Sequence, residues 1–305
     1  MTELIRSPSK KILILGAYGQ LGTQLQQDLI GFASIYARSH QEIDLTVAPS
    51  ILRRQIEQIQ PDVILNTSAY TDVVKAESNK EAAYLINEAS LSNLANICAL
   101  LDITLVHFST DYVFDGESRA PYHEDSLTNP LSVYGHSKRC GEIKIQASGC
   151  KHIIIRTSWL YSIHGENFAN TIIRLLRQGK ELNIVNDQLG TPTSALFLAD
   201  VVKKILVCLF KDSNNQTFYG TFHCTPTGHT SWYGFATYLA NNLKLKGIIN
   251  PISTDNYWDN SPVRRPKYST LCCNKISTAY NLNLETWQKS ATKYCKEITL
   301  DNSIL

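Results

Sequence analysis

The sequence predicts an α/β protein in which a doubly wound parallel sheet is followed by a smaller α/β lobe. Short apolar runs alternate with helical patterns through the first half of the chain, and a glycine-rich turn follows the first run. The length of 305 residues suits one large domain with a smaller companion. Strands that alternate with helices are typical of a parallel sheet covered by helices on both faces.

Five short apolar runs are the expected strands of this sheet, at 11–15, 34–37, 63–66, 104–109 and 152–156. Continuous apolar runs are typical of buried parallel strands. Helical periodicity fills the intervals, at 21–29, 50–59, 80–101 and the segment from about 133 onward. Because ligands bind at the carboxyl ends of such strands, we expect the residues after the first, third and fourth strands to converge.

The second half of the chain has a less regular pattern. Helices are expected at 168–178, 195–210 and 231–243, a strand at 221–224, and a proline-containing loop at 250–267. We assign residues 10–159 to a Rossmann-like nucleotide-binding domain, with a returning segment around 193–224. Residues 160–192 and 225–305 then form the substrate lobe, and residues 1–11 a short polar leader.

The composition excludes several classes of protein. Hydrophobic residues make up 43% and charged residues 18%, and the net charge is +2, so nothing favours a nucleic acid or a membrane as partner. No apolar run approaches the length of a membrane span, and no signal peptide is visible. The eight cysteines form no C-x-x-C pair, so we expect reduced thiols, no metal site and a cytoplasmic location.

The glycine-rich turn spans residues 16–22, after the first strand and before the first helix. Glycine allows a sharp turn and a close approach of the backbone to a pyrophosphate, and the helix N-terminus offers free N–H groups. We expect a dinucleotide to contact Gly16, Tyr18, Gly19, Gln20, Leu21 and Gly22. The alternative is a glycine-rich connection that binds nothing.

Residues after the second and third strands indicate which dinucleotide binds. Arg38 stands where an acidic residue would favour NAD, and an arginine suits a 2′-phosphate, so NADPH is favoured over NADH. A solvated surface arginine is the alternative. Asp44 and Leu45 could contact the adenine, and Ser68, Ala69 and Tyr70 leave room for the cofactor.

Tyr134 and Lys138 stand four residues apart, so on a helix they share one face. A lysine ammonium beside a phenol lowers the pKa of the tyrosine, which could then give a proton to a carbonyl oxygen that receives a hydride. Thr110, at the end of the fourth strand, could hydrogen-bond that oxygen and orient it. Lys138 could also hold the nicotinamide ribose. The sequence therefore predicts a Thr/Tyr/Lys catalytic set for the reduction of a ketone.

Several segments with these residues resemble the dTDP-4-dehydrorhamnose reductase family of the extended short-chain dehydrogenase/reductase superfamily. The resemblance runs from about residue 11 to residue 287. It is carried by 16–22, 66–77, 109–116, Tyr134 with Lys138, 156–161, 165–168, 186–193 and 264–266. The runs Ser-Thr-Asp-Tyr-Val-Phe-Asp-Gly and Asn-Asp-Gln-Leu-Gly-Thr-Pro-Thr are the most specific.

The resemblance implies NADPH-dependent reduction of a dTDP-linked 4-keto-6-deoxy sugar to dTDP-L-rhamnose for cell-surface polysaccharide. It implies Thr110, Tyr134 and Lys138 as catalytic, Asp111, Val113 and Trp159 near the sugar nucleotide, and Arg264 in the substrate lobe. A homodimer is also implied, although no interface is visible in the sequence.

Three alternatives share much of this pattern. The same catalytic set would serve an enzyme that forms the talose epimer, or a ring-contracting enzyme of the dihydrostreptose type. The regulatory subunit of methionine adenosyltransferase resembles this family without being a reductase. The complete glycine turn and the intact Thr110/Tyr134/Lys138 set favour an enzyme.

Overall fold

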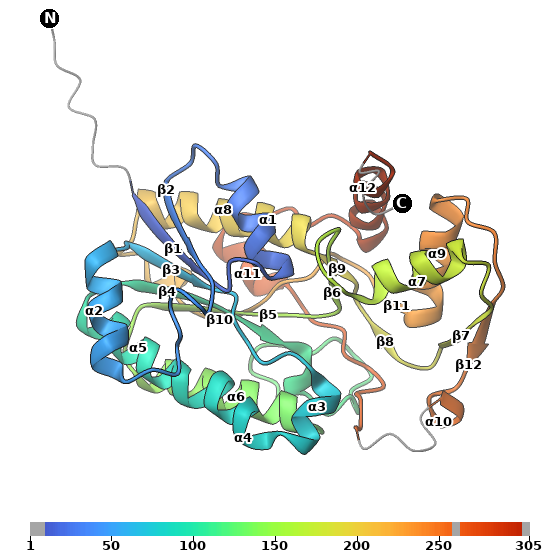
Figure 1. Cartoon of the computed structure of the whole chain (residues 1–305), viewed down its shortest axis with the longest axis horizontal. Helices are drawn as coiled ribbons and strands as arrows, with labels where there is room; N and C mark the ends of the chain where they lie inside the picture. The colour runs from blue at the N-terminus through green and yellow to red at the C-terminus, as the bar shows by residue number, and fades with distance from the viewer. Residues whose placement is uncertain (1–9, 258–262, 301–305) are drawn as a thin grey trace, which may run out of the picture.

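A computed structural model describes residues 10–257 and 263–300 of the chain (Figure 1). Most of the predicted leader lies outside these residues, and its last residue, Lys11, already belongs to the first strand. No helix in the described ranges is long and apolar enough to cross a membrane.

The main sheet has six strands in the order β10-β5-β4-β3-β1-β2, and every pairing in it is parallel. Its strands are β1 (Lys11–Leu15), β2 (Ser34–Arg38), β3 (Val63–Asn66), β4 (Thr104–Thr110), β5 (His152–Thr157) and β10 (Gly220–His223). The predicted doubly wound parallel sheet is confirmed. The chain winds from β1 outward to β2, then in the opposite direction through β3, so the strand order reverses between β1 and β3. Ligands of such sheets bind at this switch point.

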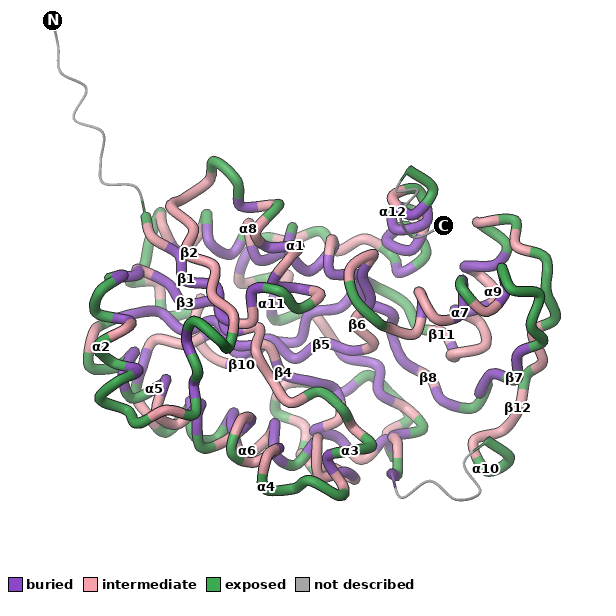
Figure 2. Tube along the Cα trace, in the orientation of Figure 1, coloured by how far each residue is buried: buried purple, intermediate pink, exposed green. Residues whose placement is uncertain are grey.

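Helices cover both faces of the sheet (Figure 1). One face packs against α1 (Gln20–Asp28), α8 (Ala195–Lys211) and α11 (Asn274–Ala279), and the other against α2 (Pro49–Ile59), α5 (Ser90–Leu100) and α6 (Val133–Ala147). Strand residues alternate between these layers, since Ile12 and Ile14 belong to the first hydrophobic cluster and Leu13 and Leu15 to the second. The central strands are accordingly buried along their length (Figure 2).

The smaller lobe is built on α7 (Phe168–Arg177), α9 (Trp232–Asn242) and α12 (Trp287–Leu300). One two-stranded sheet pairs β7 (Leu182–Val185) with β12 (Ile249–Ile252). Two further pairs have strands of only two residues: β6 (Leu160–Tyr161) with β9 (Thr193–Ser194), and β8 (Leu189–Gly190) with β11 (Thr230–Ser231). The lobe therefore depends on packing of its helices more than on sheet hydrogen bonds.

Three segments differ from the prediction. The expected helix at 80–101 consists of α4 (Lys80–Tyr84), a π-helical turn (Leu85–Ala89) and α5, and it is preceded by a short helix, α3 (Val73–Ser78). The loop prediction for 250–267 is wrong at its start, where β12 and α10 (Thr254–Tyr257) lie. Pro251 is tolerated in β12 because that strand pairs on one side only, with β7.

The third difference concerns the lobe boundary. Within the expected lobe segment 225–305, Ile276 of α11 and the nearby Tyr280 pack in the core of the main sheet. The chain thus returns to the domain of the main sheet a second time before it enters α12. Sequence periodicity could not reveal this, because a short amphipathic helix does not specify which sheet it covers.

Candidate functional site

The glycine-rich turn follows β1 and meets the loop after β3. Gly16 has a φ of 77°, and a Cβ atom at this position would lie 2.7 Å from the backbone nitrogen of Ser68. Gly19 caps α1 without any side-chain hydrogen bond. The N–H groups of the first helical turn therefore have no side-chain cap, as a pyrophosphate site requires. These features fit a dinucleotide cofactor.

The other predicted residues of this turn divide into two groups. Leu21 and Gly22 are buried beneath the turn, whereas Tyr18 is 78% exposed. Gln20 accepts a hydrogen bond of 3.1 Å from Nδ2 of Asn167, a residue at the start of α7. Gln20 thus joins the glycine-rich turn to the smaller lobe.

Arg38 ends β2 and lies beside Glu42. Its Nη1 donates to the carbonyl of Ala37 at 2.9 Å and lies 3.8 Å from Oε1 of Glu42. Hydrogen bonds from Ser39, with a smaller contribution from Arg38, lower the pKa of Glu42. A 2′-phosphate at Arg38 would therefore compete with this carboxylate, and the predicted role of Arg38 stays a prediction.

Asp44 and Leu45 were predicted to contact the adenine. Oδ1 of Asp44 accepts two hydrogen bonds of 2.8 Å from Thr46, which lower the pKa of the carboxyl group. Leu45 is buried in the hydrophobic cluster under α2. Asp44 is exposed and Leu45 is not, so the leucine side chain fixes the loop rather than facing a ligand.

Thr110 and Tyr134 come together at the carboxyl end of β4. Oγ1 of Thr110 donates to Oδ1 of Asp111 at 3.1 Å and accepts the backbone N–H of Tyr112 at 3.2 Å. Burial raises the pKa of Tyr134, and a hydrogen bond with Thr110 acts in the opposite direction. Two of the three predicted catalytic side chains thus lie close enough to influence each other.

Lys138 is buried one helical turn after Tyr134 and points at β4. Its Nζ donates to the carbonyl of Phe108 at 2.7 Å and lies 3.0 Å from Nε2 of His107. Burial lowers the pKa of Lys138 to about 8, while Glu142 acts to raise it. The predicted fall in the pKa of Tyr134 is wrong for this structure, since desolvation of the phenol exceeds every favourable interaction.

The first turn of α6 is fixed by three contacts. The hydroxyl of Ser132 accepts the N–H of Gly135 at 3.1 Å, and Oε1 of Glu77 accepts the N–H of Val133 at 2.8 Å. Gly135 lies against the 3-10 turn Asp111–Val113, where a Cβ atom would come within 2.2 Å of the carbonyl oxygen of Tyr112. Only glycine allows the helix to approach this turn so closely.

A buried ion pair holds the middle of α6 against β5. Arg156 donates to both oxygens of Glu142, from Nε at 2.9 Å and from Nη2 at 2.7 Å, and both side chains are almost fully buried. Arg139 adds a contact of 3.2 Å to the same carboxylate. This two-point geometry fixes the rotation of the helix that carries Tyr134 and Lys138.

Asn87, in the π-helical turn, is one residue that the sequence analysis missed. Its Oδ1 accepts the N–H of Tyr70 at 2.9 Å, and its Nδ2 donates to the carbonyl of Tyr70 at 3.1 Å and to Oγ of Ser137 at 3.0 Å. It therefore links the loop after β3, with the predicted Ser68, Ala69 and Tyr70, to α6. A π-helical turn is frequent at functional sites, but it gives no signal in the sequence.

Asp111 is buried beside the Thr110–Tyr134 pair. Burial raises the pKa of Asp111 to about 7, although the hydroxyls of Ser269 and Thr110 act to lower it. Val113, which the resemblance placed near the sugar nucleotide, is fully buried in a cluster with Phe114 and Leu271. Its side chain cannot face a ligand, so only its backbone could.

Of the two adjacent arginines, Arg265 reaches the site. A hydrogen bond from Arg265 and its charge oppose the effect of burial, which raises the pKa of Tyr112 to about 12. The ring of Tyr112 meets the ring of Tyr134 edge-on, with centroids 5.9 Å apart. Arg264, the predicted residue, is exposed. Sequence alone could not decide between two adjacent arginines in a loop.

Trp159 lies between β5 and β6 with a φ of 47°. Its ring stacks on Trp232 of α9, with centroids 3.6 Å apart and planes 8° apart. Nε1 of Trp232 donates to Oε1 of Gln188 at 3.2 Å. Trp232 was not predicted, yet it connects Trp159 to the predicted 186–193 segment.

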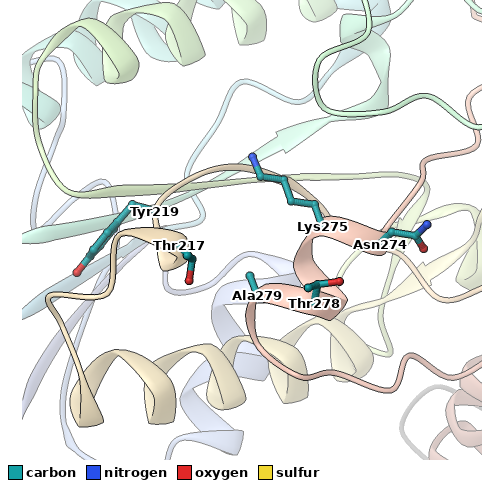
Figure 3. A pocket seen from close by; sticks show the side chains of 6 residues that line it. All are labelled: Thr217, Tyr219, Asn274, Lys275, Thr278 and Ala279. Carbon is teal, nitrogen blue, oxygen red and sulfur yellow. The ribbon is translucent and has the colours of Figure 1, made fainter.

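A hollow of about 510 Å³ lies elsewhere, at the edge strand β10 beside α11 (Figure 3). Lys275 there donates to the carbonyl of Thr221 at 2.8 Å. The main sheet separates β10 from β1 and β3, where the glycine turn lies, so this hollow is not the candidate site. No cluster of metal-ligating side chains is present among the residues that the structure describes.

The family model described as the RmlD substrate binding domain matches residues 10–300. The chain belongs to this family. Among curated members, dTDP-4-dehydrorhamnose reductase of Escherichia coli is 35% identical over 303 residues, covering 96% of this chain and 99% of that protein.

Solved structures of the family have the same fold. The dTDP-4-dehydrorhamnose reductase of Bacillus anthracis in complex with NADP is 34% identical, with a TM-score of 0.88 and coverage of 95% and 99%. The orthologue from Clostridium acetobutylicum is 36% identical, with a TM-score of 0.87 and the same coverage. Both likenesses extend over the main sheet and the smaller lobe together.

Proposed function

We propose that this protein reduces the C4 ketone of dTDP-4-dehydro-L-rhamnose with NADPH, giving dTDP-L-rhamnose for cell-surface polysaccharide. The observation that carries the proposal is the contact of Thr110 with Tyr134 at the carboxyl end of β4, beside the switch point that the glycine turn occupies. Its relatives from Escherichia coli and Bacillus anthracis are named for this reaction, and the latter was crystallised with NADP.

Bound NADPH would supply the hydride for the ketone carbon. Tyr134 would donate its phenolic proton to the ketone oxygen, and its raised pKa keeps that proton in place until the carbonyl is bound. Thr110 would hydrogen-bond the same oxygen and orient it. Lys138, held by the carbonyl of Phe108, would contact the nicotinamide ribose. The side chains of this protein would thus bind the cofactor, orient the ketone and deliver one proton to its oxygen.

The sugar nucleotide would lie between the main sheet and the smaller lobe. Asp111, whose carboxylate contacts Thr110, would accept a hydrogen bond from a sugar hydroxyl. The stacked Trp159 and Trp232 would offer an aromatic surface to the sugar nucleotide. Arg264 or Arg265 would supply a positive charge to its diphosphate. The cofactor contacts would come from the 16–22 turn, Arg38 and residues 68–70. A homodimer and a cytoplasmic location complete the proposal.

The test combines consumption of NADPH with analysis of the product. Purified protein is incubated with NADPH and enzymatically prepared dTDP-4-dehydro-L-rhamnose, and the C4 configuration of the product is determined by NMR. We expect NADPH oxidation and the rhamnose configuration. A product with the talose configuration or a contracted ring would show that the protein catalyses a related reaction instead of the proposed one. Protein that binds NADPH but oxidises it with no 4-keto sugar nucleotide would overturn the proposal.

A further inference from the structure

A chain of buried polar side chains lies beneath Lys138. It runs from the backbone of Ser68 through Asn66, at the end of β3, and His107, in β4, to Nζ of Lys138. Asn66, His107 and Lys138 are all buried. Because buried donors and acceptors must be paired, the direction of each hydrogen bond in the chain can be derived from the one group whose role is fixed.

The fixed group is the backbone N–H of Ser68, which can only donate. It lies 3.2 Å from Oδ1 of Asn66, and the hydroxyl of Ser68 donates to the same oxygen at 2.6 Å. This sets the orientation of the amide, so Nδ2 of Asn66 faces Nδ1 of His107 at 3.1 Å. An amide nitrogen donates, and Nδ1 must therefore be the unprotonated nitrogen of the ring.

The consequence reaches Lys138. A neutral imidazole carries one proton, so with Nδ1 unprotonated the proton is on Nε2, which faces Nζ at 3.0 Å. An N–H group can only donate to Nζ if the lysine is the neutral amine. The amine still has hydrogens to donate to the carbonyl of Phe108. Every group in this arrangement is satisfied.

The charged lysine requires a different arrangement. An ammonium group has no lone pair, so it would donate to Nε2 and the ring proton would move to Nδ1. One proton enters from solvent in this change. The amide of Asn66 would then have to turn its oxygen toward His107, which leaves the backbone N–H of Ser68 facing a second donor. This arrangement leaves a part-buried donor unpaired.

We infer that Asn66 and His107 are positioning residues that stabilise the neutral amine of Lys138 and thereby favour loss of its proton, and that the tautomer of His107 inverts when Lys138 gains a proton. The inference concerns the site of the proposed function and rests on it for its catalytic meaning. A lysine that loses its proton readily does not draw the proton away from Tyr134, where a reductase needs it.

The electrostatics of the site agree with this geometry. Burial keeps the pKa of His107 well below its usual value, and the charge of Lys138, when it is protonated, lowers that pKa further, so the ring is neutral in both protonation states of Lys138. Burial lowers the pKa of Lys138 to about 8, and Glu142 is the charge that opposes this. Glu142 is itself paired with Arg156 of β5 and with Arg139.

Several other titratable groups on the elements around α6 have partners of their own. Glu77 of α3 accepts a hydrogen bond from the N–H of Val133, and the hydroxyl of Tyr84 of α4 contacts His136. Glu88 of the π-helical turn lies 3.8 Å from Lys144. Tyr112 contacts Arg265, and Asp111 contacts Thr110. Tyr134 lies one turn before Lys138 on the same helix.

NMR of protein labelled with 15N in histidine tests the tautomer directly, without cofactor or substrate. The signal of His107 is assigned by His107→Gln. In the free enzyme at about pH 9, above the pKa of Lys138, we expect the proton on Nε2, and its transfer to Nδ1 as Lys138 titrates. A proton on Nδ1 at about pH 9, or a tautomer that stays constant through the titration, would overturn the inference.

Two variants separate the role of the Asn66 amide from that of the surrounding structure. Asn66→Asp replaces the donor with acceptors only, so we expect the proton on Nδ1. Ser68→Ala is the matched control, because it removes the hydroxyl and keeps the backbone N–H that orients the amide, so the proton should stay on Nε2. An unchanged tautomer in Asn66→Asp, or an inverted one in Ser68→Ala, contradicts the inference.

The protonation of Lys138 gives a second readout. Its pKa is followed by NMR of protein with 13Cε-labelled lysine, with Lys138→Met as the assignment control. Asn66→Leu, which adds no charge, should raise this pKa by about one pH unit and move the corresponding limb of the kcat/KM profile equally. Ser68→Ala should leave the pKa unchanged, and no rise in Asn66→Leu would refute the inference. The spectra need no turnover, so failure here is distinguishable from failure of the reductase assay.

Discussion

The two halves of the candidate site are held together in different ways. Around α6, buried charged groups and directed hydrogen bonds fix each side chain, as the Arg156–Glu142 pair and the Lys138 contacts do. Around α9, Trp159 stacks on Trp232, Phe168 packs at a tilt of 55° against Trp232, and the neighbouring strands β8 and β11 pair over two residues. The ion pair between Arg174 and Glu166 in this lobe is exposed.

This difference suits the two tasks of the proposed reaction, which are proton delivery and recognition of the sugar nucleotide. Proton delivery depends on the position of a few atoms, so the proposed catalytic side chains, on α6 and at the end of β4, have directional partners. Recognition of a large sugar nucleotide depends on shape and area, which stacked rings provide with less demand on geometry. We therefore expect substitutions near α6 to impair turnover or folding strongly, and substitutions near α9 to impair substrate binding moderately.

The largest expected effect is on turnover. Tyr134→Phe removes the proton donor and should lower kcat by about 10²–10⁴-fold, while binding of NADPH, measured by fluorescence, is retained. Tyr112→Phe is the control, since its ring contacts that of Tyr134 but it has no assigned proton to deliver. Unchanged turnover in Tyr134→Phe would eliminate its proposed role.

The second largest expected effect is on the free energy of unfolding, which should differ between substitutions in the two regions. Glu142→Gln leaves the buried Arg156 without its countercharge and should lower the free energy of unfolding by about 3–5 kcal/mol, measured by denaturant titration. Glu166→Gln disrupts the exposed pair in the lobe and should change it by less than about 1 kcal/mol. Equal losses in both variants would show that the comparison is wrong.

The dependence of stability on pH tests the buried carboxyl group. The raised pKa of Asp111, about 7, means that the folded protein holds this proton more tightly than the unfolded chain. Its contribution is complete below the unfolded pKa of 3.8 and is lost as the pH rises to about 7.

Asp111→Asn lacks this loss, so relative to the native protein its free energy of unfolding should increase between those pH values, by up to about 4 kcal/mol. Denaturant titrations across the range measure this, with the exposed Asp44→Asn as control. A constant difference between Asp111→Asn and the native protein would show that the carboxyl group is ionised in the folded state.

The smallest expected effect is in the lobe. Trp232→Phe keeps an aromatic ring but reduces stacking on Trp159, and should raise KM for the sugar nucleotide by about 2–10-fold with kcat nearly unchanged. Phe235→Leu is the control, because Phe235 is buried in the lobe core and should affect stability rather than KM. A loss in kcat alone would assign Trp232 to the catalytic half.

The sequence by itself determined the strands and most helices of the main sheet, the glycine turn, and the Thr110/Tyr134/Lys138 set. These features depend on local rules: apolar runs of strand length, periodicity of 3.6 residues, and the backbone freedom of Gly16. The sequence also indicated the family, because the motifs that carry the resemblance are contiguous runs of residues.

Only the tertiary structure decided which partner each polar group has. Nδ2 of Asn66 meets a ring nitrogen 41 residues away, and that ring meets Lys138 another 31 residues on. Burial at this meeting point reversed the predicted shift in the pKa of Tyr134. Desolvation and hydrogen-bond direction are properties of a packed environment, and no spacing along the chain specifies them.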